Sequence, residues 1–222
     1  MVSRWQLWLS PRPMKRTPIS SEPRIVQAHD AALFEFLQED DGRWVVKETH
    51  HFDNKVVRDG RSGPPLHIHW RQTEYFQVEK GAIGIMKNEK EFVGTKDDGI
   101  LEVPAGTRHR FWAHSSTTED LVFKVWAEPQ DLDHSFDQNF LRNFTGYQRD
   151  CQMQNLKPSP FQLILFSYNS STVGTPPFWM PLWLLKGGSY VLAYWIAKGL
   201  LGYKESYPEY TLPPEPQNRK TV

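Results

Sequence analysis

The chain has 222 residues, enough for one domain with an extension, and its 26 basic residues balance its 26 acidic residues. A formal net charge of zero is not the footprint of a nucleic-acid-binding protein, so we expect no nucleic-acid partner. Cys151 is the single cysteine, which excludes an internal disulfide and gives no sign of an oxidising compartment. We therefore expect a cytoplasmic protein.

Residues 1–30 predict an N-terminal arm in front of the folded domain. Trp5, Leu7, Trp8 and Leu9 form an apolar core that is too short for a secretory signal, and prolines follow it. The arm is therefore either mobile or a segment that docks on a surface.

Residues 31–129 contain short apolar segments separated by turn residues, a pattern that predicts an all-β sandwich or barrel. A closed or double-sheet arrangement would protect the edges that such short strands expose. The predicted strands are 43–52, 66–70, 74–79, 82–87, 91–93, 100–103, 109–114 and 121–127.

The pattern changes after Pro129, and residues 130–206 predict a helical extension that packs on the barrel or on an interface. Aromatic and leucine residues recur at helical spacing over 135–150, and 161–166 is a short apolar run. The segment 207–222 is rich in proline and polar residues, and we expect it to be disordered.

The segment 176–201 is the most aromatic part of the extension. Pro181 and the pair Gly187–Gly188 interrupt it, and each half is too short to cross a membrane. Two short helices here would cap the barrel or fill a homodimer interface. Alternatively, they would make a peripheral membrane contact, with Trp and Tyr at the depth of the lipid headgroups.

Four residues with metal-binding chemistry stand at the starts of three predicted strands. His67 and His69 are separated by one residue, so they lie on the same face of one strand. Glu74 opens the next strand, and His109 opens a later one. Three imidazoles and one carboxylate suit a first-row divalent metal. We predict that these four residues bind such an ion, without distinguishing Fe, Mn, Ni and Zn.

Other side chains are assigned to the surroundings of this centre. Phe76 lies two residues after Glu74, and Phe111 lies two residues after His109, so each ring faces the same side of its strand as a ligand. We therefore expect both rings to line an apolar substrate pocket. Trp112 and Trp126 are further candidates for this pocket, although Trp112 has the opposite parity. His51 is predicted to point into the barrel as an acid or base beside the metal.

The segments 63–81 and 99–113 resemble the two motifs of the cupin family. The first reads Gly, His-x-His, four residues, Glu, six residues and Gly, and the second reads Gly followed by Pro-x-Gly-x-x-His. All four positions that bind metal in cupins hold the residues named above. The resemblance covers 43–129, under half of the chain. It implies a mainly β fold, the cupin-type double-stranded β-barrel (jelly roll), here with C-terminal helices.

Two positions depart from the cupin pattern. Gly99 lies one residue closer to Pro104 than expected, and Ala113 replaces the asparagine near the end of the second motif. That asparagine is not a ligand in cupins. Its replacement therefore changes the polarity around the ligands, and we expect metal binding to be retained.

The resemblance implies a metal-dependent enzyme that acts on a small, largely apolar organic substrate, with His109 and Glu74 as catalytic residues. His51 is a third catalytic candidate because of its predicted place in the barrel, and no cupin motif includes it. Oxygenation, decarboxylation and isomerisation or cyclisation are all compatible with this ligand set. The whole chain also resembles small single-domain cupins with an aromatic-rich helical tail, which are found in bacteria and among fungal natural-product genes, so a role in natural-product metabolism is one expectation. The alternative is a non-catalytic cupin module that binds a hydrophobic ligand and docks its helical tail to a membrane or a partner.

Overall fold

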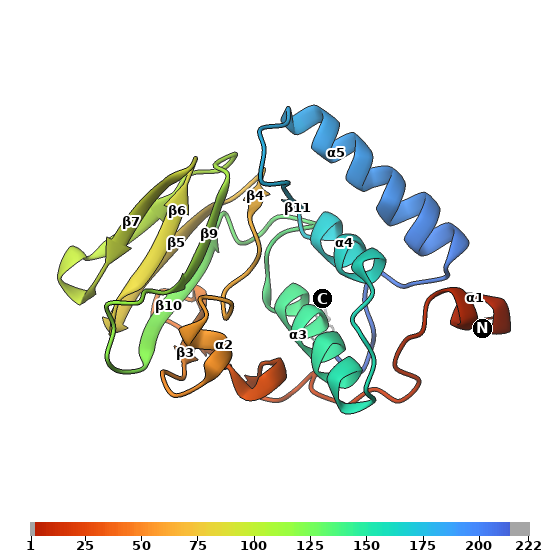
Figure 1. Cartoon of the computed structure of the whole chain (residues 1–222), viewed down its shortest axis with the longest axis horizontal. Coiled ribbons are helices and arrows are strands. Elements are labelled where there is room, and N and C mark those ends of the chain that lie inside the picture. Colours follow the sequence, from red (N-terminus) through yellow and green to blue (C-terminus); the bar gives the residue numbers. More distant parts are fainter. Residues whose placement is uncertain (1–2, 214–222) are drawn as a thin grey trace, which may run out of the picture.

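Two antiparallel β-sheets form one half of the molecule and helices form the other half (Figure 1). The computed structural model describes residues 3–213. Within them, one sheet has the spatial order β1 (Arg24–Val26), β2 (Ala32–Gln38), β3 (Trp44–His50), β10 (Leu121–Glu128), β5 (Thr73–Lys80) and β8 (Ile100–Val103). The other has the order β11 (Thr172–Gly174), β4 (His67–His69), β9 (His109–Ala113), β6 (Ile83–Lys87) and β7 (Lys90–Gly94).

The strand order is that of a jelly roll, which confirms the predicted fold class. The central strands of the two sheets follow the orders β3-β10-β5-β8 and β4-β9-β6-β7, so the chain crosses repeatedly from one sheet to the other. In the described part of the chain no strand pairs with a strand of the opposite sheet. The structure is therefore a sandwich of two packed sheets, which is the double-sheet arrangement of the two that the sequence left open.

Alternation along the strands builds the interior of the sandwich. In β5 the side chains of Glu74, Phe76 and Val78 are buried, whereas Tyr75 and Gln77 between them face outward. Phe76, Phe111 and Phe123 meet in the main core cluster. The inner faces of both sheets thus form one apolar core, in which Glu74 is one of the buried polar residues.

The extension packs beside the sandwich and contains more than helices. Its elements are α3 (Gln138–Met153), α4 (Pro160–Asn169), β11, α5 (Leu182–Tyr190) and a π-helical continuation, η3 (Val191–Leu200). The Asp137 side chain caps α3 by accepting a hydrogen bond from the Phe140 N–H at 2.7 Å. α3 and α4 agree with the predicted helices, whereas α5 and η3 form one helix that runs through Gly187–Gly188, where the sequence predicted a break. The sequence did not predict β11, which pairs with β4.

Both ends of the described chain are tied to the fold. The N-terminal arm contains α1 (Arg4–Leu9) and, near its end, β1, which pairs with β2. Tyr207 and Tyr210 are 4% and 0% exposed because they pack into an aromatic cluster with Phe166. The predicted disorder is therefore wrong for 207–213, and 214–222 lies outside the described residues. The remaining short helices are η1 (Ala28–Asp30), α2 (Lys55–Arg58) and η2 (Lys96–Asp98).

Among residues 3–213, no helix combines the length and the apolar character that spanning a bilayer would require.

Candidate metal centre

The four predicted ligands meet between the two sheets. His67 and His69 belong to β4, and His67 lies directly opposite His109 of β9. Glu74 reaches the same point from β5 in the other sheet. Their donor atoms all lie within 4.8 Å of one another. The side chains are between 1% and 7% exposed, so the cluster is closed to bulk solvent.

The distances between the donor atoms fit one common ion. In octahedral geometry, two adjacent donor atoms that each lie about 2.1 Å from the metal are about 3 Å from each other. Here His67 Nε2 lies 3.1 Å from His69 Nε2, and His109 Nε2 lies 2.9 Å from Glu74 Oε2. The second carboxylate oxygen, Glu74 Oε1, lies 3.7 Å from His69 Nε2.

Backbone carbonyls fix the orientation of two of the imidazoles. His67 Nδ1 donates to the carbonyl of Pro65 at 2.8 Å, and His109 Nδ1 donates to that of Thr107 at 2.9 Å. A carbonyl oxygen only accepts, so in each neutral ring the proton sits on Nδ1 and the Nε2 lone pair faces the centre. Acceptor atoms then face one another about 3 Å apart, and a proton or a cation must lie between them. The donor set therefore fits a divalent cation.

The extension supplies the anchor of the third imidazole. Thr172 Oγ1 of β11 lies 2.9 Å from His69 Nδ1 and also donates to the Ser170 carbonyl at 3.3 Å. Phe136 packs edge-on against the His69 ring, with the centroids 5.1 Å apart. Sequence reasoning missed both residues, because they lie 67 and 103 positions away from His69. Supporting partners of this kind orient a ligand and raise its affinity for metal.

Burial keeps the histidines in the form that binds metal. The pKa of His67 and that of His69 lie well below their usual range, first because burial disfavours the charged ring. The neighbouring imidazoles add electrostatic repulsion, which lowers both pKa values further. Neutral imidazole is the ligating form, so little protonation opposes metal binding near neutral pH.

Curated relatives match the chain over its whole length. The probable oxidoreductase virH of Hypocrea virens is 65% identical over 222 residues, and the match spans 100% of both chains. The oxidoreductase iacF of Pestalotiopsis fici is 54% identical over 91% of this chain and 100% of its own. The chain belongs to the virH/iacF family. The epoxidase atD of Aspergillus terreus is 30% identical over 92% of this chain and 68% of its own.

Other comparisons give weaker likenesses. No family model matches the chain. KdgF from a Halomonas species has a TM-score of 0.35 and 15% identity over 47% of this chain and 84% of its own. The cupin domain of Schizosaccharomyces pombe Cnp3 has a TM-score of 0.33 and 16% identity over 42% of this chain and 61% of its own. The jelly-roll assignment therefore rests on the strand order of this virH/iacF family member.

Three of the predicted site residues lie away from the centre. The His51 side chain is 43% exposed and faces Asp120 at 3.6 Å, because it follows β3 outside the sandwich. Trp126 stacks on Tyr75 on the outer face of its sheet, at 5.4 Å between ring centroids. Trp112 also lies on an outer face, under the guanidinium of Arg110. The predictions that His51 acts at the metal and that the two tryptophans line the pocket are therefore wrong.

Phe76 and Phe111 lie on the inner face, as their parity required. Their rings meet at 5.0 Å between centroids and pack with Phe123 in the core directly beside the ligands. Neither ring borders either of the two cavities described below.

A second buried polar group lies in the same interior and was not predicted. His50 Nδ1 lies 2.7 Å from Ser62 Oγ, and His50 Nε2 lies 2.9 Å from Glu48 Oε2. All three residues are at most 5% exposed. Burial raises the pKa of Glu48, and the hydrogen bond to His50 opposes that shift. The alternation of β3 gave a signal for this pair, because Glu48 and His50 share parity with Val46.

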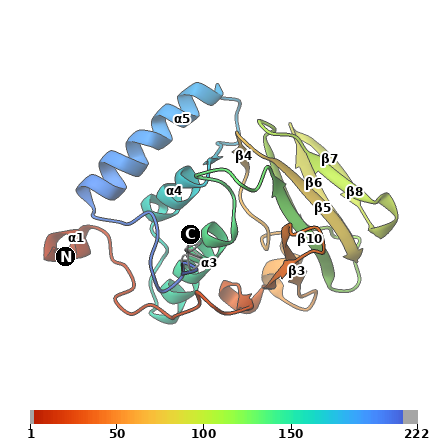
Figure 2. The same cartoon turned by 180° about the vertical axis from the view of Figure 1, so that it is seen from behind.

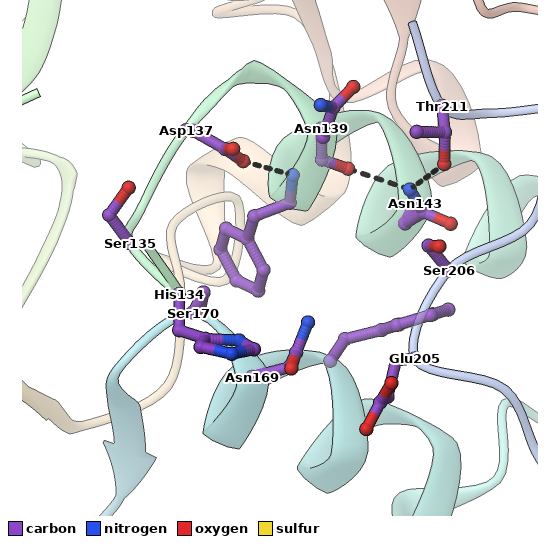
Figure 3. A pocket seen from close by; sticks show the side chains of 12 residues that line it. His134, Ser135, Asp137, Asn139, Asn143, Asn169, Ser170, Glu205, Ser206 and Thr211 are labelled. Atoms are coloured by element: carbon purple, nitrogen blue, oxygen red, sulfur yellow. Dashed lines mark hydrogen bonds between the residues drawn. The ribbon is translucent and has the colours of Figure 1, made fainter. Parts of the chain in front are cut away.

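Two cavities lie outside the centre. One of about 210 Å³ lies between α3, α4 and the C-terminal segment, where Asn143 Nδ2 donates to Thr211 Oγ1 at 3.0 Å (Figure 3). Ser170 is part of its wall and donates to Thr172 Oγ1 at 3.3 Å. The other, of about 370 Å³, borders Ile68 on the outer face of β4. None of the four ligands lines either cavity.

Proposed function

We propose that this chain is a metal-dependent oxidoreductase of the cupin type that acts on a small, largely apolar organic substrate in natural-product metabolism. The observation that carries the proposal is the convergence of three imidazoles and one carboxylate, each imidazole anchored through its other ring nitrogen. The names of the relatives support oxidation over the decarboxylation and isomerisation that the ligand set also allows.

The protein's own contribution is to hold the ligands and to exclude water. His67, His69 and His109 would bind the ion as neutral rings, and Glu74 would neutralise part of its charge. With four protein ligands, a six-coordinate ion would keep open positions. The bound ion would supply Lewis-acid and redox chemistry. Zinc has no redox chemistry, so an oxidoreductase in this fold favours Fe, Mn or Ni.

The aromatic side chains around the ligands set the dielectric of the centre. Phe136 covers His69, and the core pair Phe76 and Phe111 lies behind Glu74 and His109. A water-poor environment strengthens electrostatic interactions in the centre and protects reactive species from hydrolysis. An apolar substrate is the class that such surroundings favour.

Metal analysis of the purified full chain, followed by oxygen-uptake measurements with aromatic and 1,3-dicarbonyl compounds, tests the proposal. We expect about one ion per chain, and we expect His109→Ala to lose both the ion and turnover because it removes a ligand outright. His114→Ala is the matched control, since His114 lies beyond the end of β9 and bonds to Ser116. Full turnover by metal-free His109→Ala protein would contradict a metal-dependent reaction.

A further inference from the structure

The exposed tryptophans of the described chain all lie on two segments. Trp5 and Trp8 belong to α1, and Trp179, Trp183 and Trp195 lie in or just before the helix formed by α5 and η3. They are between 48% and 80% exposed, although tryptophan is usually well buried. We call the surface formed by these five residues the tryptophan face.

The two segments are neighbours in space. Gln6 Nε2 of α1 donates to the carbonyl of Leu200 at the end of η3, at 2.8 Å. Figures 1 and 2 show α1 next to the C-terminal end of the long helix, which runs along the outer edge of the molecule. Two segments from opposite ends of the sequence, both with exposed tryptophans, thus lie along one border of the fold.

The long helix packs on the rest of the protein through one side only. Ala193, Ala197 and Leu201 are buried against Leu165 of α4. The other side carries further apolar residues that the protein leaves open to solvent: Leu184, Tyr190, Val191 and Leu200. An apolar stripe this long on a surface helix requires a partner.

The charges of these segments are of one sign. Residues 1–21 and 176–204 hold seven of the 26 lysines and arginines and none of the 26 aspartates and glutamates. The rest of the chain therefore carries a net charge of −7, although the whole chain is neutral. The seven basic residues are Arg4, Arg12, Lys15, Arg16, Lys186, Lys198 and Lys204.

We propose that the tryptophan face docks this protein on a bilayer that contains anionic lipids. Tryptophan and tyrosine prefer the interface between headgroups and acyl chains, where an apolar body and a polar N–H or O–H are both satisfied. Arg12 is buried, and Arg16 and Lys198 pair with Glu209 and Glu205. The positive charge that acidic headgroups would attract therefore comes from the other four basic residues: Arg4, Lys15, Lys186 and Lys204. A second copy of this chain would bring the same positive segments together, so the one-sided charge favours the lipid surface over a dimer.

The test is flotation of the full-length protein with two kinds of vesicle, one of phosphatidylcholine alone and one that also contains about 30% phosphatidylserine to make its surface negative. We expect binding to the anionic vesicles, weakening as salt is raised, and a quenching of tryptophan fluorescence by brominated lipid. The double variant Trp183→Ser/Trp195→Ser should bind at least about tenfold more weakly, because each ring contributes apolar area.

Phe92→Ser is the matched control, since Phe92 is 48% exposed on β7 at the opposite end of the molecule. It should bind vesicles like the unchanged protein, and circular dichroism and metal content should be the same in all variants. Equal flotation of the double variant and the unchanged protein would overturn the proposal. A mass of two chains that falls to one chain in the double variant, without vesicle binding, would identify the face as a dimer interface instead.

Discussion

Thr172 provides a sharp test of the metal centre, because it anchors His69 from a part of the chain that contains no ligand. Thr172→Val keeps the size and branching of the side chain but removes the hydroxyl that lies 2.9 Å from His69 Nδ1. When His69 binds metal through Nε2, its Nδ1–H must donate to an acceptor. In the variant this buried N–H faces a methyl group.

The expected loss follows from that unsatisfied donor. Leaving a buried donor without a partner costs about 1–3 kcal/mol, which corresponds to a metal affinity about 5- to 150-fold weaker. Substitutions of residues that support a metal ligand usually cost 10- to 100-fold, which lies within this range. The residue is 5% exposed, so solvent does not replace the lost hydroxyl.

The assay is a competition titration of metal against a chelator of known affinity, with the folded state checked by thermal unfolding. Thr175→Val is the matched control, because the Thr175 hydroxyl accepts from Arg108 Nε at 3.1 Å and contacts no ligand. An affinity for Thr172→Val within about twofold of that control would refute the reasoning that Thr172 orients His69 for metal binding.

Two further changes test the surroundings of the centre. The lowered pKa values of His67 and His69 mean that the unfolded chain binds more protons, so the metal-free protein should be most stable above pH 6.5. Its denaturation midpoint should fall as the pH is lowered below that value, and a flat profile would contradict the burial argument. Gly63→Ala would place a methyl group 1.8 Å from the Phe111 carbonyl, so urea unfolding should show a loss of about 1–3 kcal/mol or more. Gly174→Ala, which meets nothing within 4 Å, should leave stability within about 1 kcal/mol of the unchanged protein.

The sequence predicted the parts of the centre that depend on strand alternation. Residues two positions apart in a strand lie on the same face, so the shared face of His67 and His69 did not depend on where the strand begins. The all-β class was predicted from the short apolar segments. Strand alternation also predicts the orientation of Trp126. In β10 Trp126 shares parity with Lys124, which faces outward to pair with Glu39 at 2.7 Å. The outward position of Trp126 therefore required no tertiary information.

Other features depend on contacts that no local pattern reveals. The contact of His50 with Ser62 is one such feature, because the alternation of β3 shows only that His50 shares a face with Glu48. β11 is three residues long and follows a polar turn, so it lacks the length that a periodic signal needs. Thr172 becomes a supporting residue only when that strand pairs with β4.

The late position of β11 in the chain sets an order of assembly. During translation β4 leaves the ribosome about a hundred residues before the strand that pairs with its edge, as the register of Thr172 with His69 shows. Until then the edge of β4 is free to pair with another chain, which is a recognised route to aggregation. The last hydrogen bond to His69 therefore forms only after Thr172, in the last quarter of the chain, has been synthesised, so the proposed metal centre is completed late.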